Sequence, residues 1–217
     1  MSSLEGVPSP EGSGGSRPRL LYFPWAGRAG AIRDCLRLGG VDFEDVRLPY
    51  AEYQRERGAG RLPFHLLPVL VLEDGTRIGQ SNTILRWAAR QAGLAPVDPT
   101  EALRMESIID MVEDYAARLS VTIRESDAAV RAHQREGLAE RWMPELYRNL
   151  SECLACGTSG WLVGSALTAA DLKAWHLLCK LLDGSLDGMP TDALASRPAL
   201  RAWMDRVGAA RPVDAAP

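Results

Sequence analysis

The 217-residue sequence predicts an α/β domain followed by an all-α helical bundle. Short apolar strand patterns mixed with helical patterns extend to residue 92, and a segment rich in Pro and Gly covers residues 93–99. From residue 100 to residue 217 only helical patterns follow. A chain of this length can bury a core without support from disulfides or metals.

The α/β domain is expected over residues 19–92, after a disordered arm. Residues 1–18 are rich in Gly, Ser and Pro and have few large apolar side chains, so burial cannot offset the entropy of ordering them. Residues 19–23 form a strand pattern, and residues 27–40 carry a helical apolar stripe that ends at two glycines. Residues 42–48 indicate a second strand.

The rest of this domain contains a hairpin and a helix. Residues 49–66 are interrupted by prolines and glycines and are expected to be irregular. Residues 68–78 form a hairpin pattern in which Asp74 and Gly75 favour a type I′ turn. A helix is then expected from residue 81 to about residue 91.

The helical domain contains a clear start signal. Thr168 and Asp171 form a capping-box pattern, and Leu167 and Leu172 are placed as its hydrophobic staple. Helical patterns are broken at 126, 157–160, 184–190 and 198. The tryptophans expected in the core are Trp87, Trp142, Trp161, Trp175 and Trp203.

Composition excludes several classes of protein. The formal net charge is −3 without clustered Lys and Arg, so no nucleic-acid partner is expected. No apolar run reaches the roughly 20 residues that span a membrane, and no membrane partner is expected. The first 18 residues lack the apolar segment of a secretory signal, and the four cysteines are too scattered for a disulfide framework. A cytoplasmic location follows as an expectation.

Two further patterns are predicted to be structural. Cys153 and Cys156 form a Cys-x-x-Cys pair late in a helical pattern, where packing is favoured over a redox role. His133 and His176 have no partners at the spacing of metal ligands, so no metal site is expected.

Four stretches of the sequence resemble the glutathione transferases. They are “LLYFPWAGRAGAIRDCLRLGGVDFEDVRL”, “LPFHLLPVLVLEDGTRIGQSNTILRWAA”, “WLVGSALTAADL” and “SRPALRAWMDRVGAARPV”, and the match covers about residues 19–213. The first resembles the opening of the Tyr-type enzymes, and “YFPWAGRAGAIR” with the acidic “IIDMVEDY” is nearest to the sigma class, which includes prostaglandin D synthases. The resemblance implies a thioredoxin-like first domain that binds glutathione and a helical second domain that forms the electrophile site.

Tyr22 is the catalytic residue that the resemblance implies. In the family the matching Tyr donates its hydroxyl to the sulfur of glutathione, which favours the reactive thiolate. Taken alone, Tyr22 is better interpreted as an ordinary strand aromatic packed in the core, and it is the surrounding Tyr-Phe and Gly-Arg-Ala-Gly context that favours the catalytic role. The matching Arg28 would keep the site electropositive, the alternative being a solvated arginine at a helix start. Trp25 follows Pro24 in the same loop and is a candidate for lining the electrophile pocket.

Leu67 and Pro68 are implied to bind the backbone of glutathione. The family proline at this place has a cis peptide bond, and the preceding residue pairs with the cysteinyl backbone like an added strand. The alternative is a trans proline at the first position of a strand, where proline is permitted.

The sequence departs from the family pattern at two contacts to the glycyl end of glutathione. Leu66 stands where the family often has Lys or Gln, so a polar contact is missing that His65 or Arg61 would replace. The family also uses a Trp or Lys to bind the glycine carboxylate, and Tyr53, followed by Arg55, is the candidate here.

Gln80 and Ser81 precede the helix expected at residues 81–91. A helix N-terminus binds anions through its unpaired N–H groups, and these side chains would add an amide and a hydroxyl for the γ-glutamyl carboxylate. The alternative is that Ser81 is only an N-cap. A capping box would need Glu or Gln three residues later, where the sequence has Ile84.

An acidic run suggests a cation near the second domain. Glu106, Asp110 and Asp114 recur at i, i+4, where like charges destabilise a helix. The resemblance implies a homodimer in which Asp114 reaches the γ-glutamyl ammonium in the partner subunit. The alternative is a solvated acidic face balanced by Arg104 and Arg118.

The expected function is conjugation of the glutathione thiolate to soft apolar electrophiles, with glutathione as substrate and no metal requirement. The alternatives are a glutathione-dependent isomerase of the prostaglandin D synthase type, or a non-catalytic interaction module with the same fold. A thiol-disulfide oxidoreductase is disfavoured because the loop after the first strand has no cysteine.

Overall fold

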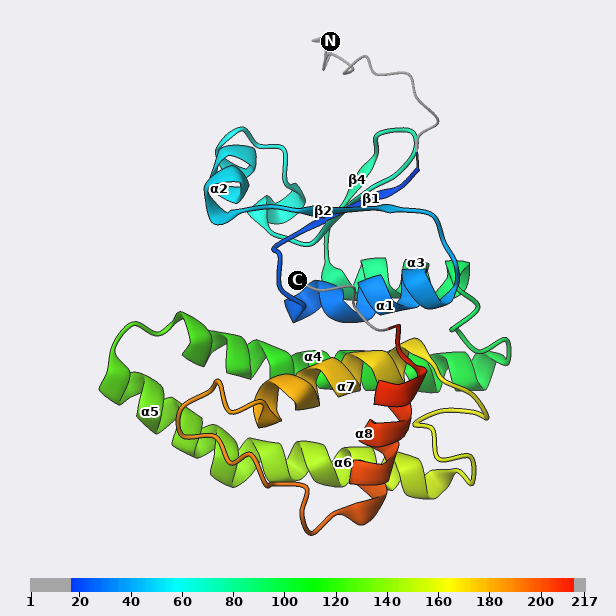
Figure 1. The fold of residues 1–217 in the computed structure, drawn as a ribbon, viewed down its shortest axis with the longest axis vertical. Coiled ribbons are helices and arrows are strands. Elements are labelled where there is room, and N and C mark those ends of the chain that lie inside the picture. Colours follow the sequence, from blue (N-terminus) through cyan, green and yellow to red (C-terminus); the bar gives the residue numbers. More distant parts are fainter. Residues whose placement is uncertain (1–16, 213–217) are drawn as a thin grey trace, which may run out of the picture.

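The computed structural model describes residues 17–212, so the expected disordered arm lies outside the described residues except for its last two positions. Figure 1 shows a small sheet with helices above a bundle of longer helices. The predicted combination of a thioredoxin-like α/β domain and a helical domain is confirmed.

The sheet has four strands in the order β2-β1-β3-β4. They are β1 (Arg19–Tyr22), β2 (Glu44–Arg47), β3 (Val69–Val71) and β4 (Arg77–Ile78). The β1–β2 pair is parallel and is connected through α1 (Gly30–Leu38), whereas β3 runs antiparallel to β1 and β4. A parallel pair needs such a crossover, which places α1 against the sheet.

The pleat of β1 decides where Tyr22 points. Successive side chains of a strand face opposite sides of the sheet. Leu20 and Tyr22 therefore join the main core with α1 and α3 (Ser81–Gln91), while Leu21 joins a smaller cluster on the other face. Because α1 and α3 lie between the sheet and the helical bundle (Figure 1), Tyr22 faces the second domain.

The expectation of an irregular segment at 49–66 is wrong. The segment contains the helix α2 (Tyr50–Gly58) and a 3-10 turn (Pro63–His65). α2 has no buried residue and therefore no apolar stripe that would reveal it in the sequence. Pro49 provides its N-cap position, and Glu52 lies in its first turn, where acidic residues favour helix.

The predicted type I′ turn is also wrong. The N–H of Gly75 donates to the carbonyl of Leu72 at 2.9 Å, and Gly75 alone in this turn has a positive φ, of 85°. A type I′ turn would require a positive φ at both central residues. The hairpin instead uses a turn followed by a glycine in the left-handed region, and its Asp74 caps Thr76 N–H at 2.8 Å.

The second domain consists of long helices. They are α4 (Pro99–Arg124), α5 (Ala128–Gly137), α6 (Met143–Cys156), α7 (Ala169–Leu182) and α8 (Pro198–Ala210), with a π-helical stretch at Leu138–Trp142. α4 starts one residue earlier than the patterns indicate, because Asp98 is its N-cap and accepts the N–H of Glu101 at 2.9 Å.

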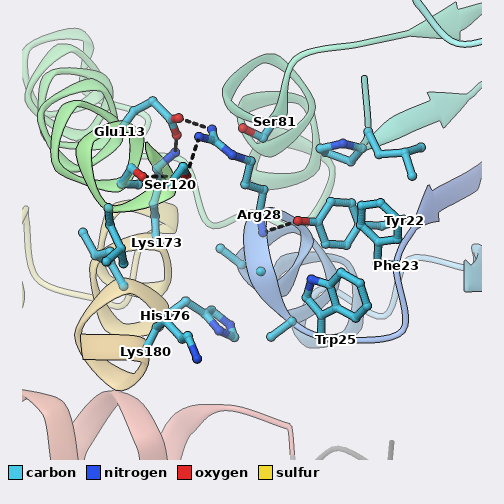
Figure 2. A pocket seen from close by; sticks show the side chains of 18 of the residues that line it. Tyr22, Phe23, Trp25, Arg28, Ser81, Glu113, Ser120, Lys173, His176 and Lys180 are labelled. Atoms are coloured by element: carbon cyan, nitrogen blue, oxygen red, sulfur yellow. Dashed lines mark hydrogen bonds and ion pairs between the residues drawn. The ribbon is translucent and has the colours of Figure 1, made fainter. Parts of the chain in front are cut away.

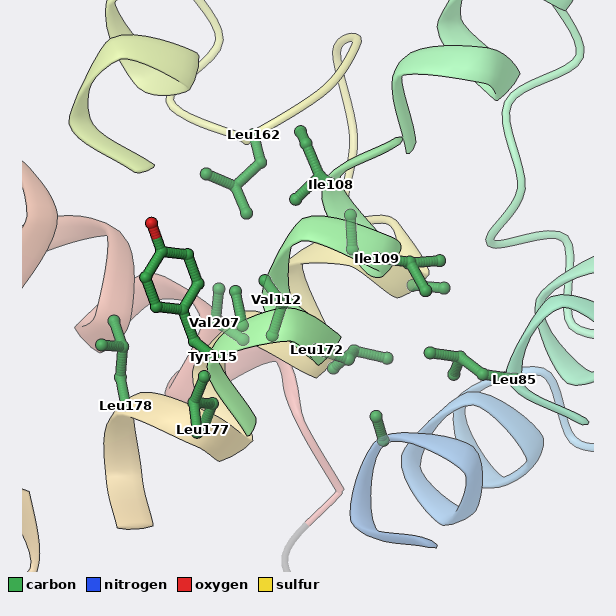
Figure 3. Packing of buried hydrophobic residues seen from close by; sticks show 14 of the residues in the cluster. Leu85, Ile108, Ile109, Val112, Tyr115, Leu162, Leu172, Leu177, Leu178 and Val207 are labelled. Carbon is green, nitrogen blue, oxygen red and sulfur yellow. The ribbon is translucent and has the colours of Figure 1, made fainter. Parts of the chain in front are cut away.

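One continuous core joins the two domains. Figure 3 shows Val112 and Leu172 of α4 and α7 packed together, with Leu85 of α3 reaching toward them from the first domain. Burial of such side chains contributes about 25 cal/mol per Å² of apolar surface. This interface fixes α4 and α7 against the α1 side of the sheet.

The predicted capping box at the start of α7 is confirmed and extends across the domain. Asp171 accepts hydrogen bonds from Thr168 N–H at 2.9 Å, Leu162 N–H at 2.9 Å and Trp203 Nε1–H at 2.8 Å. The prediction of core tryptophans holds fully only for Trp203, which is 1% exposed. The other four pack against the core and remain half-buried.

Candidate functional site

A cleft of about 1040 Å³ lies between the two domains. Its first-domain wall comes from the loop after β1, from α2, from the segment before β3 and from the start of α3. Its second wall comes from α4, α7 and Arg211. The predicted residues that line it are Tyr22, Trp25, Arg28, Tyr53, Leu66, Leu67, Pro68, Gln80 and Ser81. Figure 2 shows the labelled side chains from both walls.

The Tyr22 hydroxyl lies at the first turn of the helical segment that leads into α1. It accepts a hydrogen bond from Arg28 N–H at 3.1 Å (Figure 2). Burial raises the pKa of Tyr22, against the lowering influence of that hydrogen bond and of nearby arginine charges. The phenol is therefore a protonated donor at neutral pH.

Gly27 makes room for this hydroxyl. A Cβ at Gly27 would lie 2.5 Å from the Tyr22 hydroxyl oxygen, and its φ of +41° is one that other residues rarely adopt. Both residues of the Gly-Arg pair therefore position Tyr22. Gly27 lets the Tyr22 hydroxyl come close to the backbone, and the N–H of Arg28 donates to the hydroxyl oxygen.

Arg33 was not predicted as a site residue, yet it shapes the loop after β1. Its buried guanidinium donates to the carbonyl of Phe23 at 3.0 Å, to that of Trp25 at 2.8 Å and to Asp45 at 2.8 Å. Trp25 stacks on Phe23 with ring centroids 4.6 Å apart and is 56% exposed, at the mouth of the cleft. The sequence does not reveal that Arg33 supports this loop, because the path of the loop past the Arg33 side chain cannot be predicted from local patterns.

Arg28 projects its guanidinium across the cleft to the second domain. It forms an ion pair with Glu113 of α4 and donates to Ser120 Oγ at 3.4 Å (Figure 2). The other oxygen of Glu113 accepts Lys173 Nζ of α7 at 2.6 Å. The alternative of a solvated Arg28 is therefore wrong, and Lys173 is a cleft residue that no local pattern in the sequence indicates.

The segment before β3 borders the opposite end of the cleft. The Leu67–Pro68 peptide bond is cis, as the resemblance implied. Tyr53 lines the cleft, and its hydroxyl donates to the carbonyl of His65 at 3.5 Å. The His65 side chain is exposed and does not line the cleft, and Arg61 is engaged with Glu56 at 2.6 Å.

The start of α3 has the properties of an anion site. Its N-cap is Gln80, whose side chain makes no capping hydrogen bond, so the alternative of Ser81 as the N-cap is wrong. The first hydrogen bond of the helix reaches back from Ile84 N–H to Gln80 O, which leaves the N–H groups of the first turn unused by the helix. The Ser81 hydroxyl has no hydrogen-bond partner among the described residues.

The acidic run of α4 is balanced by cations other than those expected. Asp110 pairs with Arg86 and accepts Asn82 Nδ2 at 2.8 Å, and Glu106 lies 4.0 Å from Arg86. Arg104 and Arg118 form no ion pair with this run among the described residues.

Asp114 is exposed, and its carboxylate has no side-chain partner within residues 17–212. It does not line the cleft of its own chain. The prediction that Asp114 acts on a partner subunit stays a prediction.

A second charged cluster connects the domains at the base of the cleft. Asp34 of α1 is buried and accepts His176 Nε2 at 2.7 Å and Arg211 at 3.2 Å. Burial alone would raise the pKa of Asp34, but these two partners hold it below its ordinary value. A Cβ at Gly30 would lie 2.5 Å from His176, so this contact also needs a glycine.

Three other features bear on function. Within residues 17–212, no three His, Cys, Asp or Glu side chains gather in a way that could hold a metal ion. No helix in the same range is both long and apolar enough to cross a membrane. Cys153 is half-buried and Cys156 exposed at the end of α6, and both are free thiols.

Known proteins resemble this chain along most of its length. A family model described as “Glutathione S-transferase, C-terminal domain” matches residues 113–215. Glutathione S-transferase 2 of Caenorhabditis elegans is 34% identical over 76% of this chain and 88% of its own. Hematopoietic prostaglandin D synthase of Gallus gallus is 31% identical over 88% of this chain and 90% of its own.

A solved structure agrees with this assignment. Prostaglandin synthase D of Nilaparvata lugens superposes with a TM-score of 0.77 at 26% identity, covering 88% of this chain and 92% of its own. The sequence relatives, the fold and the two-domain cleft agree, and the chain belongs to the glutathione transferase family.

Proposed function

We propose that this chain catalyses attack of the glutathione thiolate on soft, apolar electrophiles, with Tyr22 as the catalytic residue. The observation that carries the proposal is the Tyr22 hydroxyl, which borders the cleft and stays protonated because burial raises its pKa. A cysteine thiol has a pKa of about 8.5 and is mostly protonated at neutral pH. A donor aimed at the sulfur stabilises the thiolate and so increases the reactive fraction.

The glutathione backbone would lie along the first-domain wall. Leu67 offers its N–H and C=O to the cysteinyl residue, in the manner of an added strand. Gln80, Ser81 and the free N–H groups of α3 would bind the γ-glutamyl carboxylate. Tyr53 is the proposed contact for the glycine carboxylate, with Leu66 beside it.

The electrophile would occupy the wall formed by the second domain. Leu119, Ile123 and Leu177 line this side, and the exposed ring of Trp25 lines the cleft from the first domain. Apolar side chains favour an apolar electrophile, which burial would hold within reach of the thiolate.

A glutathione-dependent isomerase is the second candidate, because the chain is also similar to a prostaglandin D synthase, at 31% identity against 34% for the transferase of Caenorhabditis elegans. Both reactions begin with the same thiolate. They differ in whether the glutathione sulfur remains bonded to the product.

We further propose a homodimer in the cytoplasm. Large apolar side chains are exposed beside the cleft, with Phe64 at 67% and Leu66 at 52%, and Leu103 of α4 is 68% exposed. Phe64 lies in the turn before β3 and has a φ of 56°. Pairing of these surfaces between two chains would bury them. All four cysteines are free thiols, which supports a reducing compartment.

The test is retention on immobilised glutathione followed by a conjugation assay with an apolar electrophile. Retention with turnover that depends on Tyr22 supports the transferase. Turnover of a prostaglandin endoperoxide without net consumption of glutathione would favour the isomerase. Neither retention nor turnover would indicate the non-catalytic interaction module.

A further inference from the structure

Lys173 of α7 lines the cleft and links its own helix to α4 and α3. Its ammonium donates to Glu113 Oε2 of α4 at 2.6 Å (Figure 2). It also donates to Asn82 Oδ1 of α3. The Lys173 side chain is 12% exposed, and burial lowers its pKa, against the raising influence of Glu113. A lysine is rarely buried without a partner, so this placement has a cost that Glu113 offsets.

Glu113 is shared between two cations. One oxygen accepts Arg28 and the other accepts Lys173. Burial alone would raise the pKa of Glu113, but the charges of Lys173 and Arg28 hold it below its ordinary value, so Glu113 is a carboxylate at neutral pH. The charge of Asp110 on α4 also acts on Lys173, and Asp110 is itself paired with Arg86 of α3.

The charges of this triad contribute to how positive the cleft is, beside those of Arg124, Lys180, Asp183 and Arg211, which also line it. Two cations and one carboxylate leave one net positive charge. Without Lys173, the same carboxylate would be paired with Arg28 alone, and the pair would be neutral. Arg28 is the member whose N–H holds the Tyr22 hydroxyl and whose charge acts on it. Interactions between charges are strong in a partly buried cleft.

We infer that Lys173 is a positioning residue for the thiolate chemistry, acting by neutralising Glu113 so that Arg28 keeps the cleft electropositive. This inference rests on the proposed function. It assigns the role to a helix of the second domain, whereas the groups proposed to touch glutathione within this chain come from the first.

The experiment measures the pKa of the bound glutathione thiol from its thiolate absorbance in a pH titration, together with glutathione affinity. We expect Lys173→Met to raise that pKa by about one unit, which leaves about tenfold less thiolate at neutral pH. Lys173→Arg should restore the wild-type value. The double variant Lys173→Met with Glu113→Gln should also recover most of it, since both opposing charges are removed.

The double variant Arg86→Met with Asp110→Asn is the matched control, because it removes both charges of a neighbouring ion pair and leaves no unpaired carboxylate acting on Lys173. Arg86 likewise joins α3 to α4 through an ion pair, with Asp110, but it does not contact Arg28. Loss of this pair should lower the melting temperature without moving the thiol pKa. Lys173→Gln removes the same charge and replaces Lys173→Met if that variant does not fold.

The outcomes separate this inference from the proposed function. An unchanged thiol pKa in Lys173→Met, or a double variant no better than the single one, would overturn the role of Lys173 while leaving the transferase proposal intact. A wild-type chain that binds glutathione without lowering its thiol pKa, or does not bind it, would overturn both.

Discussion

Gln80, the residue before α3, lines the cleft in an unfavourable backbone conformation. Gln80 has a φ of 73° and a ψ of 113°, a conformation that L residues rarely adopt. Such strain costs on the order of 1–3 kcal/mol and is concentrated at functional sites. Ser81, next to it, keeps a hydroxyl without a partner in the described chain. Both observations fit a ligand that contacts this turn.

Replacing Tyr22 with Phe tests the proposed thiolate donor. The hydroxyl acts on the sulfur and contributes little to binding of the ground state, so turnover should fall on the order of 100-fold while glutathione affinity changes little. Steady-state kinetics and binding calorimetry on the same preparation measure the two quantities. Equal turnover in variant and wild type would exclude Tyr22 as the catalytic residue.

Ser81→Ala separates ligand binding from helix capping. Because Gln80 is the N-cap, loss of the Ser81 hydroxyl should barely change the melting temperature. If the hydroxyl binds the γ-glutamyl carboxylate, affinity for glutathione should fall about tenfold, as for one hydrogen bond to a charged group. Unchanged affinity would assign the carboxylate to other groups.

At the scale of elements, the loop after β1 is the part that the chemistry depends on most. Arg33 from α1 holds its carbonyls, and Gly27 ends it at the point where Tyr22 needs space. The loop is therefore supported from α1, an element buried against both domains.

Gly27→Ala should disturb this support. The new methyl would lie 2.5 Å from the Tyr22 oxygen, and the positive φ would cost about 1–2 kcal/mol. Turnover should fall together with stability. Gly40→Ala is the control, because Gly40 also has a positive φ, of +63°, but no atom within 4 Å of the added methyl. It should lose similar stability and keep its turnover. Equal kinetic losses in both variants would remove the special role of Gly27.

Helices and strands with a local apolar or capping pattern could be predicted from the sequence. Elements without such a pattern could not. The stripe of α1, the capping box of α7 and the strand β1 have local signals that the fold retains. The polar α2 has no such signal, and the hairpin at Gly75 depends on which residues pair across it.

Site residues likewise could be predicted where they share a local motif and could not where only the packing of the two domains brings them together. Tyr22 and Arg28 lie in one short motif and could be found together. Lys173 lies 60 residues from Glu113 along the chain, and nothing local marks the pair that they form. Contacts between the domains depend on packing, which a single sequence does not reveal.

At the scale of the whole molecule, Asp34 joins the two domains electrostatically. Its folded pKa is lowered, so its contribution to stability is fully present above the ordinary value of 3.8 and is lost as pH falls through the folded pKa. Asp34→Asn should be less stable than wild type by about 3 kcal/mol near neutral pH, since a buried pair is broken. The difference should shrink below about pH 4.

Urea unfolding at a series of pH values measures this difference. Asp42→Asn is the control, because Asp42 pairs with Arg17 at the surface, where ion pairs contribute little. A constant stability gap between Asp34→Asn and wild type across the acid range would show that packing, rather than the charge of Asp34, accounts for the loss.

The largest scale is the proposed homodimer, and Asp114 provides its sharpest test. Asp114 is exposed, has no side-chain partner within residues 17–212 and does not line its own cleft. The ammonium of glutathione needs an acid near the Ser81 site, and Glu113, which does line that cleft, is already shared by Arg28 and Lys173. An acid from a second chain would supply this partner for the ammonium.

Asp114→Asn should then weaken glutathione binding about tenfold, while turnover at saturating glutathione stays close to that of the wild type. Dilution to monomer should weaken binding of the wild type in parallel, and sedimentation with affinity measured at each concentration follows both. A monomer with full affinity would refute the shared site.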